Sequence, residues 1–320
     1  MAKKRICILG GSGFVGRHLC ALLARERHHV RVLTRRWLKA RNLLVYPTLE
    51  LVETDVHFAS KLSVHFRDCD AVVNLVGILN EGSSESERFE TAHAALPEKV
   101  VEACQFNRVP RLLHMSALNA AYDAPSKYLR TKAAGEDAAH AGSASGIHVT
   151  SFQPSVIFGL DDDFFNRFAK LLSISPLIFP LACPGSRFAP VHVEDVARAF
   201  VDALDDKTTY GKRFQLCGPR DYSLLELVEY TARTAGIRRA VIELGEELSK
   251  LQALVLERLP GKPFSYDNYR SLQVDSVCSC NGLEQFGISP ASIEAIVPRY
   301  LGKENKTGRY QDLRAHAGRD

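Results

Sequence analysis

Short apolar runs and longer amphipathic segments alternate through the first half of the chain. The apolar runs lie at residues 5–9, 29–33, 49–52, 71–76, 112–115 and 148–153, and each has the length of a buried strand. Apolar residues at helical spacing predict helices over 14–27, 89–105 and 127–139. Strands that alternate with helices are typical of an α/β fold, a doubly wound parallel sheet covered on both faces.

The pattern becomes irregular after Pro154. We expect a helix at 164–172, four prolines between 176 and 190, a helix at 194–204, a strand at 213–216, and mostly helices from 222 to 301. This pattern predicts a dinucleotide-binding domain that is made of residues 1–157 together with residues 187–218, where the chain comes back to the same domain. Residues 158–186 and 219–302 form a smaller, mostly helical substrate lobe, and 303–320 form a polar, frayed tail.

Composition and charge exclude some classes of protein. The 320 residues are 46% apolar and carry a formal charge of +4, with 41 basic and 37 acidic residues. This excess is too small to indicate a nucleic-acid partner. The basic start, MAKKR, is followed at once by a short apolar run and glycines, which is not a signal peptide. No run approaches the roughly 20 apolar residues of a membrane span.

The eight cysteines include no CxxC pair, and four of them lie inside apolar segments. A free thiol in such a position packs as a small hydrophobic group. We therefore predict reduced, structural cysteines and a cytoplasmic location, with peripheral membrane association left open. The acidic run Asp161-Asp162-Asp163 precedes a helix and is read as its cap, and the histidines have no paired spacing, so no metal site is expected.

Four glycines crowd the sequence GGSGFVG, residues 10–16, between the first strand and the first helix. A dinucleotide pyrophosphate at this point needs close backbone N–H groups and no Cβ in its way. Gly10 would allow the tight turn, Gly13 the approach of the phosphates, and Gly16 close packing of the helix on the sheet. The stretch therefore predicts a dinucleotide cofactor at the start of this helix.

The end of the second strand indicates which cofactor. Folds that prefer NAD carry an acidic residue there for the ribose 2′-hydroxyl. This chain instead has Arg35 and Arg36 in LTRRWLKAR, and a guanidinium suits a 2′-phosphate. We therefore predict a preference for NADP(H), with NAD(H) as the alternative. Asp55, after the third strand, either accepts a hydrogen bond from the adenine amino group or caps the following helix.

A catalytic-looking set lies further along the chain. Tyr128 and Lys132, in SKYLRTKAAGE, project from one face of a helix because they are four residues apart. A nearby ammonium lowers the pKa of a phenol, so the pair could move the proton that accompanies hydride transfer. Ser116 ends the preceding strand and could hold the substrate oxygen.

One amphipathic segment, residues 247–259, carries Leu248, Leu251, Val255 and Leu259 on one side. Packing against the substrate lobe is the first interpretation of this stripe. A protein partner or a membrane surface is the second.

These motifs together resemble an extended short-chain dehydrogenase/reductase of the NAD-dependent epimerase/dehydratase family. The matching stretches are GGSGFVG (10–16), Asp55-Val56, NLVG (74–77), Ser116, YLRTK (128–132), QPSVIFG (153–159), PVHVEDVARAF (190–200) and LCGPRDYSLLEL (216–227). The double Arg, FGLDDDFFNRFAKL (158–171) and FGISPASIEAIVPRYL (286–301) resemble an atypical branch. That branch contains the dehydrogenase-like accessory subunit of respiratory complex I and its bacterial relatives.

The resemblance implies a Rossmann domain with NAD(P) bound along the carboxyl ends of its strands. The cofactor-binding positions that it implies are Gly10, Ser12, Gly13, Phe14, Val15, Gly16, Arg35, Arg36, Asp55, Val56, Leu75, Val76, Gly77, Tyr128, Lys132, Pro154 and Ser155.

The resemblance also leaves two functions open. One is NADP(H)-dependent oxidoreduction or epimerisation of a quinone- or isoprenoid-related molecule or a nucleotide sugar. The other is a cofactor-loaded structural or assembly subunit with little turnover. His93 bears on this choice, because it stands where active relatives usually carry an Asn that supports a proton relay.

Overall fold

The computed structural model describes residues 3–81, 88–259 and 263–302, and these divide into two units. Unit 1 comprises Met1–Ser155, Val193–Cys217 and Cys278–Ser289, and unit 2 comprises Val156–His192, Gly218–Val277 and Pro290–Asp320. Two segments lie elsewhere than expected. Residues 187–192 belong to unit 2, and Cys278–Ser289 belongs to unit 1. The expected polar tail, 303–320, is outside the described residues.

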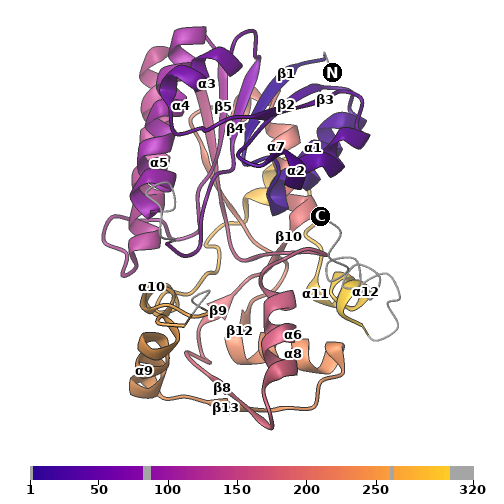
Figure 1. The fold of residues 1–320 in the computed structure, drawn as a ribbon, viewed down its shortest axis with the longest axis vertical. Helices are drawn as coiled ribbons and strands as arrows, with labels where there is room; N and C mark the ends of the chain where they lie inside the picture. Colours follow the sequence, from indigo (N-terminus) through magenta and orange to yellow (C-terminus); the bar gives the residue numbers. More distant parts are fainter. Residues whose placement is uncertain (1–2, 82–87, 260–262, 303–320) are drawn as a thin grey trace. The chain divides into compact units, whose positions relative to one another are not determined.

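Unit 1 is built on a seven-stranded sheet (Figure 1). Its strand order is β11-β6-β5-β4-β1-β2-β3, and every pairing is parallel, as the Rossmann interpretation predicts. The central strands are buried throughout because helices cover both faces. The strands are β1 (Arg5–Leu9), β2 (His29–Thr34), β3 (Leu49–Glu53), β4 (Ala71–Asn74), β5 (Arg111–Met115), β6 (His148–Pro154) and β11 (Arg213–Leu216).

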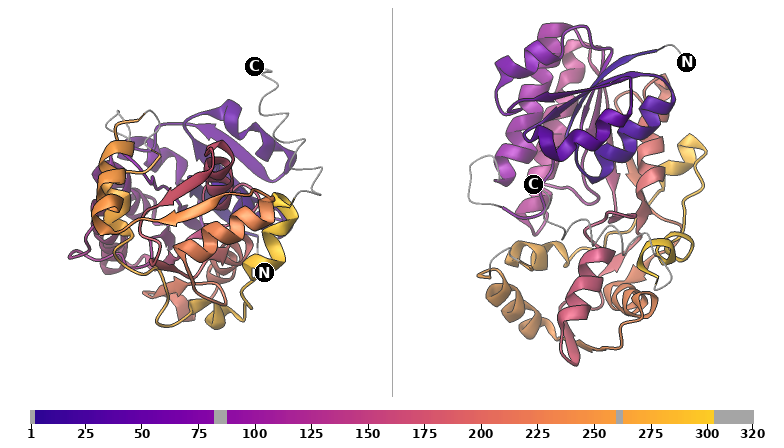
Figure 2. Two further views of the ribbon diagram at one scale, coloured as in Figure 1. Left: turned by 90° about the horizontal axis from the view of Figure 1, so that it is seen from below. Right: turned by 45° about the vertical axis from the view of Figure 1, so that its right-hand side comes forward.

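The helices of unit 1 form two layers, one on each face of the sheet (Figure 1 and Figure 2). On one face α1 (Phe14–Arg25) packs against α7 (Val193–Ala203), with α2 (Trp37–Ala40) nearby. On the other face α3 (Ala59–His65) and α5 (Lys127–Ala141) pack against α4 (Leu96–Asn107). A π-helical turn, η3 (Glu90–Ala95), leads into α4 where one continuous helix was expected. Short 3₁₀ turns are η1 (Arg41–Val45), η4 (Gly142–Ser145), η5 (Lys207–Thr209) and η6 (Gly282–Phe286).

The edge strand β11 is tied to the returning segment Cys278–Ser289. Cys217, at the end of β11, forms a disulfide bond with Cys278. The Asn281 side chain reinforces this link, accepting a hydrogen bond from the Cys217 N–H (3.3 Å) and donating one to its carbonyl (2.8 Å). The prediction of reduced cysteines is therefore wrong for this pair, and the cysteine argument for a reducing compartment loses its basis. The two residues are 61 positions apart, so only the fold brings them together.

Unit 2 mixes helices with three two-stranded sheets. The sequence predicts mostly helices after residue 222, but β13 pairs with β8 through contacts between distant segments. The strands are β7 (Ile157–Phe158), β8 (Ile178–Leu181), β9 (Arg187–Phe188), β10 (Val191–His192), β12 (Tyr222–Ser223) and β13 (Ala240–Glu243). The helices are α6 (Phe165–Ile174), α8 (Leu224–Ala235), α9 (Glu246–Leu256), α10 (Tyr266–Ser271), α11 (Ile293–Ile296) and α12 (Pro298–Leu301).

Asp162 shows what the acidic run in unit 2 does. Its buried carboxylate accepts hydrogen bonds from the N–H groups of Phe164 (3.0 Å) and Asn166 (3.1 Å) at the start of α6. The Tyr300 hydroxyl also donates to it, at 2.7 Å. The structure confirms the expected cap, and the contact with Tyr300 anchors α12 to the same turn. Within the described segments, no group of three or more His, Cys, Asp or Glu residues is placed to hold a metal ion.

Candidate functional site

The glycine-rich turn after β1 is a tight backbone cradle. Gly10 has a φ of +77°, and a Cβ added there would lie 3.0 Å from the Leu75 carbonyl carbon. A Cβ on Gly16 would lie 2.4 Å from the Gly10 carbonyl oxygen, so α1 can start this close to the turn only with glycine. The Gly13 N–H donates a hydrogen bond to the same carbonyl (3.0 Å). Gly13 is also the N-cap residue of α1, so no side chain there covers the N–H groups of the first turn. The first turn of α1 is thus arranged as a phosphate-binding N-terminus requires.

The other residues of the turn connect it to β2. The Ser12 and Thr34 hydroxyls lie 3.3 Å apart, and Thr34 Oγ1 accepts a hydrogen bond from the Arg36 N–H (3.3 Å). Phe14 and Val15, in the first turn of α1, are partly exposed. The glycine turn and the end of β2 therefore form one continuous rim.

Arg35 and Arg36 are exposed on this rim, immediately after β2. The sequence shows no acidic residue at this position, but the structure brings a carboxylate close to it from the neighbouring strand. Glu53, at the end of β3, pairs in register with Thr34 and accepts a hydrogen bond from the Trp37 N–H (2.8 Å). Glu53 therefore caps α2, while Arg35 and Arg36 remain exposed.

Asp55 and Val56 follow β3. The Asp55 carboxylate accepts a hydrogen bond from the His57 N–H (3.0 Å), whereas α3 begins after Phe58 without a side-chain cap. Of the two expected roles, the structure rules out capping of α3. The Val56 side chain is buried in the core, so only its backbone can face a ligand.

The segment Leu75–Gly77 joins the turn to the residues on α5. The Leu75 N–H donates to the Leu9 carbonyl (3.0 Å), and the Val76 N–H donates to the Asn74 side chain (3.2 Å). A Cβ on Gly77 would lie 3.9 Å from Lys132 Nζ and 3.8 Å from His93 Nε2. A path of close contacts therefore runs from Gly10 through Leu75 and Gly77 to Lys132.

Tyr128 and Lys132 share a face of α5, as their spacing predicts. The Tyr128 ring packs edge-on against the His93 ring, with centroids 5.4 Å apart, and against Phe89 at 5.9 Å. Lys132 is buried, and its Nζ donates to the Met115 carbonyl at 2.6 Å. Burial raises the pKa of Tyr128 to about 12 and lowers the pKa of Lys132 to about 8. The expected lowering of the Tyr128 pKa by Lys132 is therefore wrong, because burial raises that pKa, and the phenol is protonated at neutral pH.

His93 lies in the π-helical turn, with both ring nitrogens in contact with protein groups. Nε2 accepts a hydrogen bond from the Ile78 N–H (3.0 Å), so in the neutral ring the proton is on Nδ1, which faces the Thr131 hydroxyl at 3.1 Å. Burial and the Lys132 charge lower the pKa of His93 to about 2, which keeps the ring neutral. Gly135 brings α5 against this turn, where a Cβ would lie 1.6 Å from the His93 carbonyl oxygen.

Ser116 is placed differently from the pair on α5. Its buried hydroxyl donates to Glu136 Oε2 at 2.9 Å. Glu136 also accepts hydrogen bonds from Ser151 (2.6 Å) and Gln153 (2.8 Å), and its charge raises the pKa of Lys132, partly offsetting burial. The sequence analysis missed Glu136. Its position, four residues after Lys132 on the same helix face, was the available signal.

Pro154 ends β6, Ser155 follows it, and both are buried. Ser155 donates its N–H to the Leu216 carbonyl (2.9 Å), and the Pro154 carbonyl accepts from the Leu118 N–H (3.1 Å). These contacts extend the sheet hydrogen bonding beyond β5 and β6.

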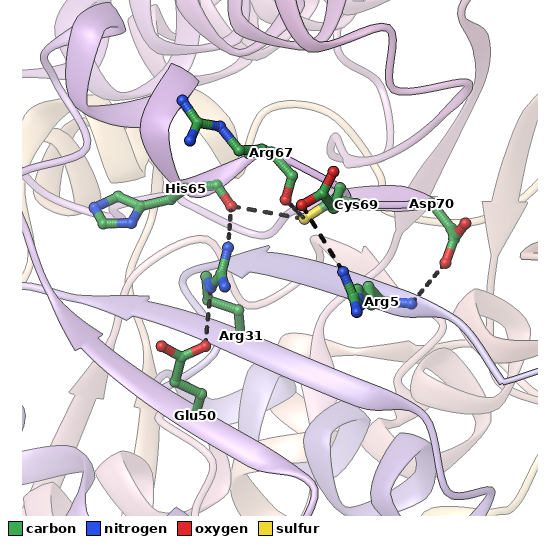
Figure 3. A network of polar contacts seen from close by, with 8 residues as sticks. Arg5, Arg31, Glu50, His65, Arg67, Cys69 and Asp70 are labelled. Carbon is green, nitrogen blue, oxygen red and sulfur yellow. Dashed lines mark hydrogen bonds and ion pairs between the residues drawn. The ribbon is translucent and has the colours of Figure 1, made fainter.

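A cavity of about 350 Å³ lies elsewhere, at the amino ends of β1, β2 and β3. There Arg31 donates to Glu50 (3.0 Å) and to the His65 carbonyl (2.8 Å), and the Cys69 thiol donates to the same carbonyl (Figure 3). All predicted site residues lie instead at or beyond the carboxyl ends of the strands or on α1 and α5. In parallel α/β sheets, ligands bind at the carboxyl ends.

Comparison with known proteins agrees with this geometry. The chain is 27% identical over 314 residues to the mitochondrial NADH-ubiquinone oxidoreductase 40 kDa subunit of Neurospora crassa, covering 96% of this chain and 80% of that protein. It is 30% identical over 206 residues to the ceramide reductase of Caulobacter vibrioides, covering 62% of this chain and 61% of that protein. The structure of UDP-N-acetylglucosamine 4-epimerase from Methanobrevibacter ruminantium M1 shares the fold, with a TM-score of 0.72 at 16% identity, covering 98% and 100% of the two chains.

A family model provides the decisive match, because it spans the glycine turn, the Tyr128–Lys132 pair and the whole parallel sheet. It matches residues 6–217, well over half of the chain. The expected resemblance is confirmed: the chain belongs to the NAD dependent epimerase/dehydratase family.

Proposed function

We propose that the chain binds NADP(H) along the carboxyl ends of β1–β4 and acts as an oxidoreductase or epimerase on a small molecule. The observation that carries the proposal is the path from the glycine turn to Lys132. A Cβ at Gly10 or Gly16 would strike backbone, and Gly77 lies beside Lys132 Nζ. Arg35 and Arg36 support the preference for NADP(H), because guanidinium groups suit a 2′-phosphate.

The residues present fit such a cofactor, whose nicotinamide supplies or accepts a hydride when bound. Tyr128, protonated at neutral pH, donates the proton that a reduced carbonyl needs. Lys132 orients this site through its bond to the Met115 carbonyl and adds positive charge next to it. Substrate classes consistent with this chemistry are quinone- or isoprenoid-related carbonyls and nucleotide sugars.

A second function, a cofactor-loaded subunit with little turnover, is favoured by two observations. The Ser116 hydroxyl is directed to Glu136, and both His93 nitrogens have protein partners, so neither is poised for a substrate or a relay. The Neurospora relative is named as a 40 kDa subunit of an NADH-ubiquinone oxidoreductase. Docking of unit 2 on a protein complex or a membrane surface belongs to this alternative. No helix in the described part of the chain is long and apolar enough to cross a membrane.

Calorimetric titration with NADPH and NADH at equal ionic strength tests the cofactor. We expect tighter binding of NADPH, and a double change of Arg35 and Arg36 to Ala that weakens NADPH far more than NADH. Arg67→Ala is the control. It removes an exposed arginine that lies at the amino ends of the strands, opposite the carboxyl ends where the cofactor is proposed to bind. Equal affinities for the two cofactors would refute the preference.

Transfer of deuterium from labelled NADPH to a panel of quinones, ketones and sugar nucleotides tests turnover. We expect Tyr128→Phe to retain NADPH affinity and to lower transfer by about 10²–10⁴, the contribution of a positioned acid. Binding of NADPH without transfer to any substrate would favour the subunit function instead.

A further inference from the structure

Helix α9 of unit 2 has its apolar face turned to solvent. Four large apolar side chains along it, on α9 and the turn that follows, have exposed fractions between 47% and 56%: Leu248, Leu251, Val255 and Leu259. The residues that face the unit are small, since Ser249 and Ala253 are 1% and 0% exposed. The first interpretation of this stripe, packing against the lobe, is therefore wrong.

The inner face of α9 is fastened by polar contacts. Ser249 Oγ accepts a hydrogen bond from the Cys183 N–H (3.2 Å) and donates to the Leu244 carbonyl (3.2 Å). Gln252 donates to the Pro180 carbonyl (2.9 Å) in β8. About half of each apolar side chain of the stripe therefore remains exposed. Covering exposed apolar area of this kind with another surface lowers the free energy.

The pattern of the stripe suits one kind of partner. At about 100° per residue, the four apolar side chains fall within an arc of about 80°. Glu247 and Arg258 flank this arc on the same side, about 16 Å apart along the axis. Both are exposed, and helical i→i−3 bonds continue the turn from α9 through Leu259.

From this we infer that α9 pairs with the α9 of a second copy of the chain, in antiparallel orientation. The two-fold axis of such a pair is perpendicular to both helices and passes between their centres. It keeps the flanking residues of both copies on the same side of the contact and reverses their order along the helix. Glu247 of each copy then faces Arg258 of the other, twice, while Leu251 and Val255 meet across the axis. In a parallel pair the two-fold axis runs along the helices, so the flanking residues of the two copies lie on opposite sides of the contact and Glu247 does not meet Arg258. This inference does not depend on the proposed function, because it uses only residues of unit 2.

The charges argue for a second copy over an anionic membrane. Helix α9 and the turn after it contain Glu246, Glu247 and Glu257 against Lys250 and Arg258, so they have no excess of basic residues. One helix face is smaller than the roughly 800 Å² per partner of a standard stable interface. The pair should therefore form in a concentration-dependent way.

Sedimentation velocity of the full chain over a range of concentrations tests the pairing. We expect a monomer–dimer equilibrium that Leu251→Asp abolishes. Phe106→Asp, at a 79% exposed apolar position in unit 1, is the matched control and should leave the equilibrium unchanged. Thermal melting of each variant confirms that the fold is retained.

Charge reversals decide the orientation. Glu247→Arg alone and Arg258→Glu alone should each weaken the dimer about tenfold, because two attractive pairs become repulsive. A mixture of the two single variants should recover a heterodimer of wild-type strength, and so should the double variant. A chain that stays monomeric at every concentration, or charge variants without effect, would overturn the inference. So would flotation with phosphatidylcholine–phosphatidylglycerol vesicles that depends on Leu251 in the absence of self-association.

Discussion

The glycine turn and the Tyr128–Lys132 pair lie in the same unit but are specified in different ways. In the turn, backbone geometry decides what fits, because Cβ atoms at Gly10 and Gly16 would meet other backbone atoms. On α5, the chemistry depends on burial and on neighbouring side chains. Burial lowers the pKa of Lys132 and Glu136 raises it, while burial and Lys132 lower the pKa of His93. Motifs in sequence therefore locate both parts, but they predict the geometry of the first part better than the side-chain environment of the second.

The strongest test of the backbone part is Gly16→Ala. The added Cβ would lie 2.4 Å from the Gly10 carbonyl oxygen and 2.5 Å from the Gly11 Cα, and backbone cannot yield as a flexible side chain can. We expect the free energy of unfolding to fall by about 3 kcal/mol or more, measured by urea denaturation. Gly245→Ala, where a Cβ meets nothing within 4 Å, should be close to neutral. Equal stability of the two variants would contradict the tight cradle.

The side-chain part is tested by the pH dependence of Lys132→Met. The pKa of Lys132 is about 8 in the folded protein and 10.5 when unperturbed, so between these values the unfolded chain binds more protons. Stability of the wild type should therefore rise by about 3 kcal/mol more than that of the variant from pH 8 to pH 10.5. If the free energy of unfolding depends on pH in the same way in both proteins, the pKa of Lys132 is not lowered in the fold.

His93→Asn tests the acid side. Burial and Lys132 lower the pKa of His93 from 6.5 to about 2, so the unfolded chain gains protons first as the pH falls. Between pH 6.5 and pH 5, the wild type should lose about 2 kcal/mol more stability than the variant, measured by urea denaturation at each pH. If the variant is as acid-sensitive as the wild type, His93 is not held neutral in the fold.

The smallest change in stability is expected for Gly13→Val, which separates binding from folding. The Cβ would lie 3.1 Å from the Gly10 carbonyl oxygen, a contact that a shift of a few tenths of an ångström relieves. We expect less than about 1 kcal/mol of destabilisation without ligand, but loss of the rise in melting temperature that NADPH produces in the wild type. A normal rise would mean that the phosphates do not lie over this turn.

The sequence alone determined the parts that depend on near neighbours. Alternating apolar runs and amphipathic segments predicted the parallel sheet, because strand and helix periods are local. The glycines of residues 10–16 and the four-residue spacing of Tyr128 and Lys132 placed both halves of the site for the same reason. Glu53 could not be predicted, because strand register brings it beside the end of β2. The four-residue spacing of Glu136 from Lys132 was visible in the sequence, but its partners Ser116 and Ser151 come from other segments of the chain.

Only the tertiary structure decided the contacts between distant segments. It paired β8 with β13, joined Cys217 to Cys278, and directed Ser116 toward Glu136. It also turned the leucines of α9 outward, although the same stripe in sequence would serve an inward-facing helix equally well. A periodic pattern of apolar residues predicts a helix with one apolar and one polar face. Which of the two faces packs against the rest of the unit depends on the residues of the other segments that the helix contacts.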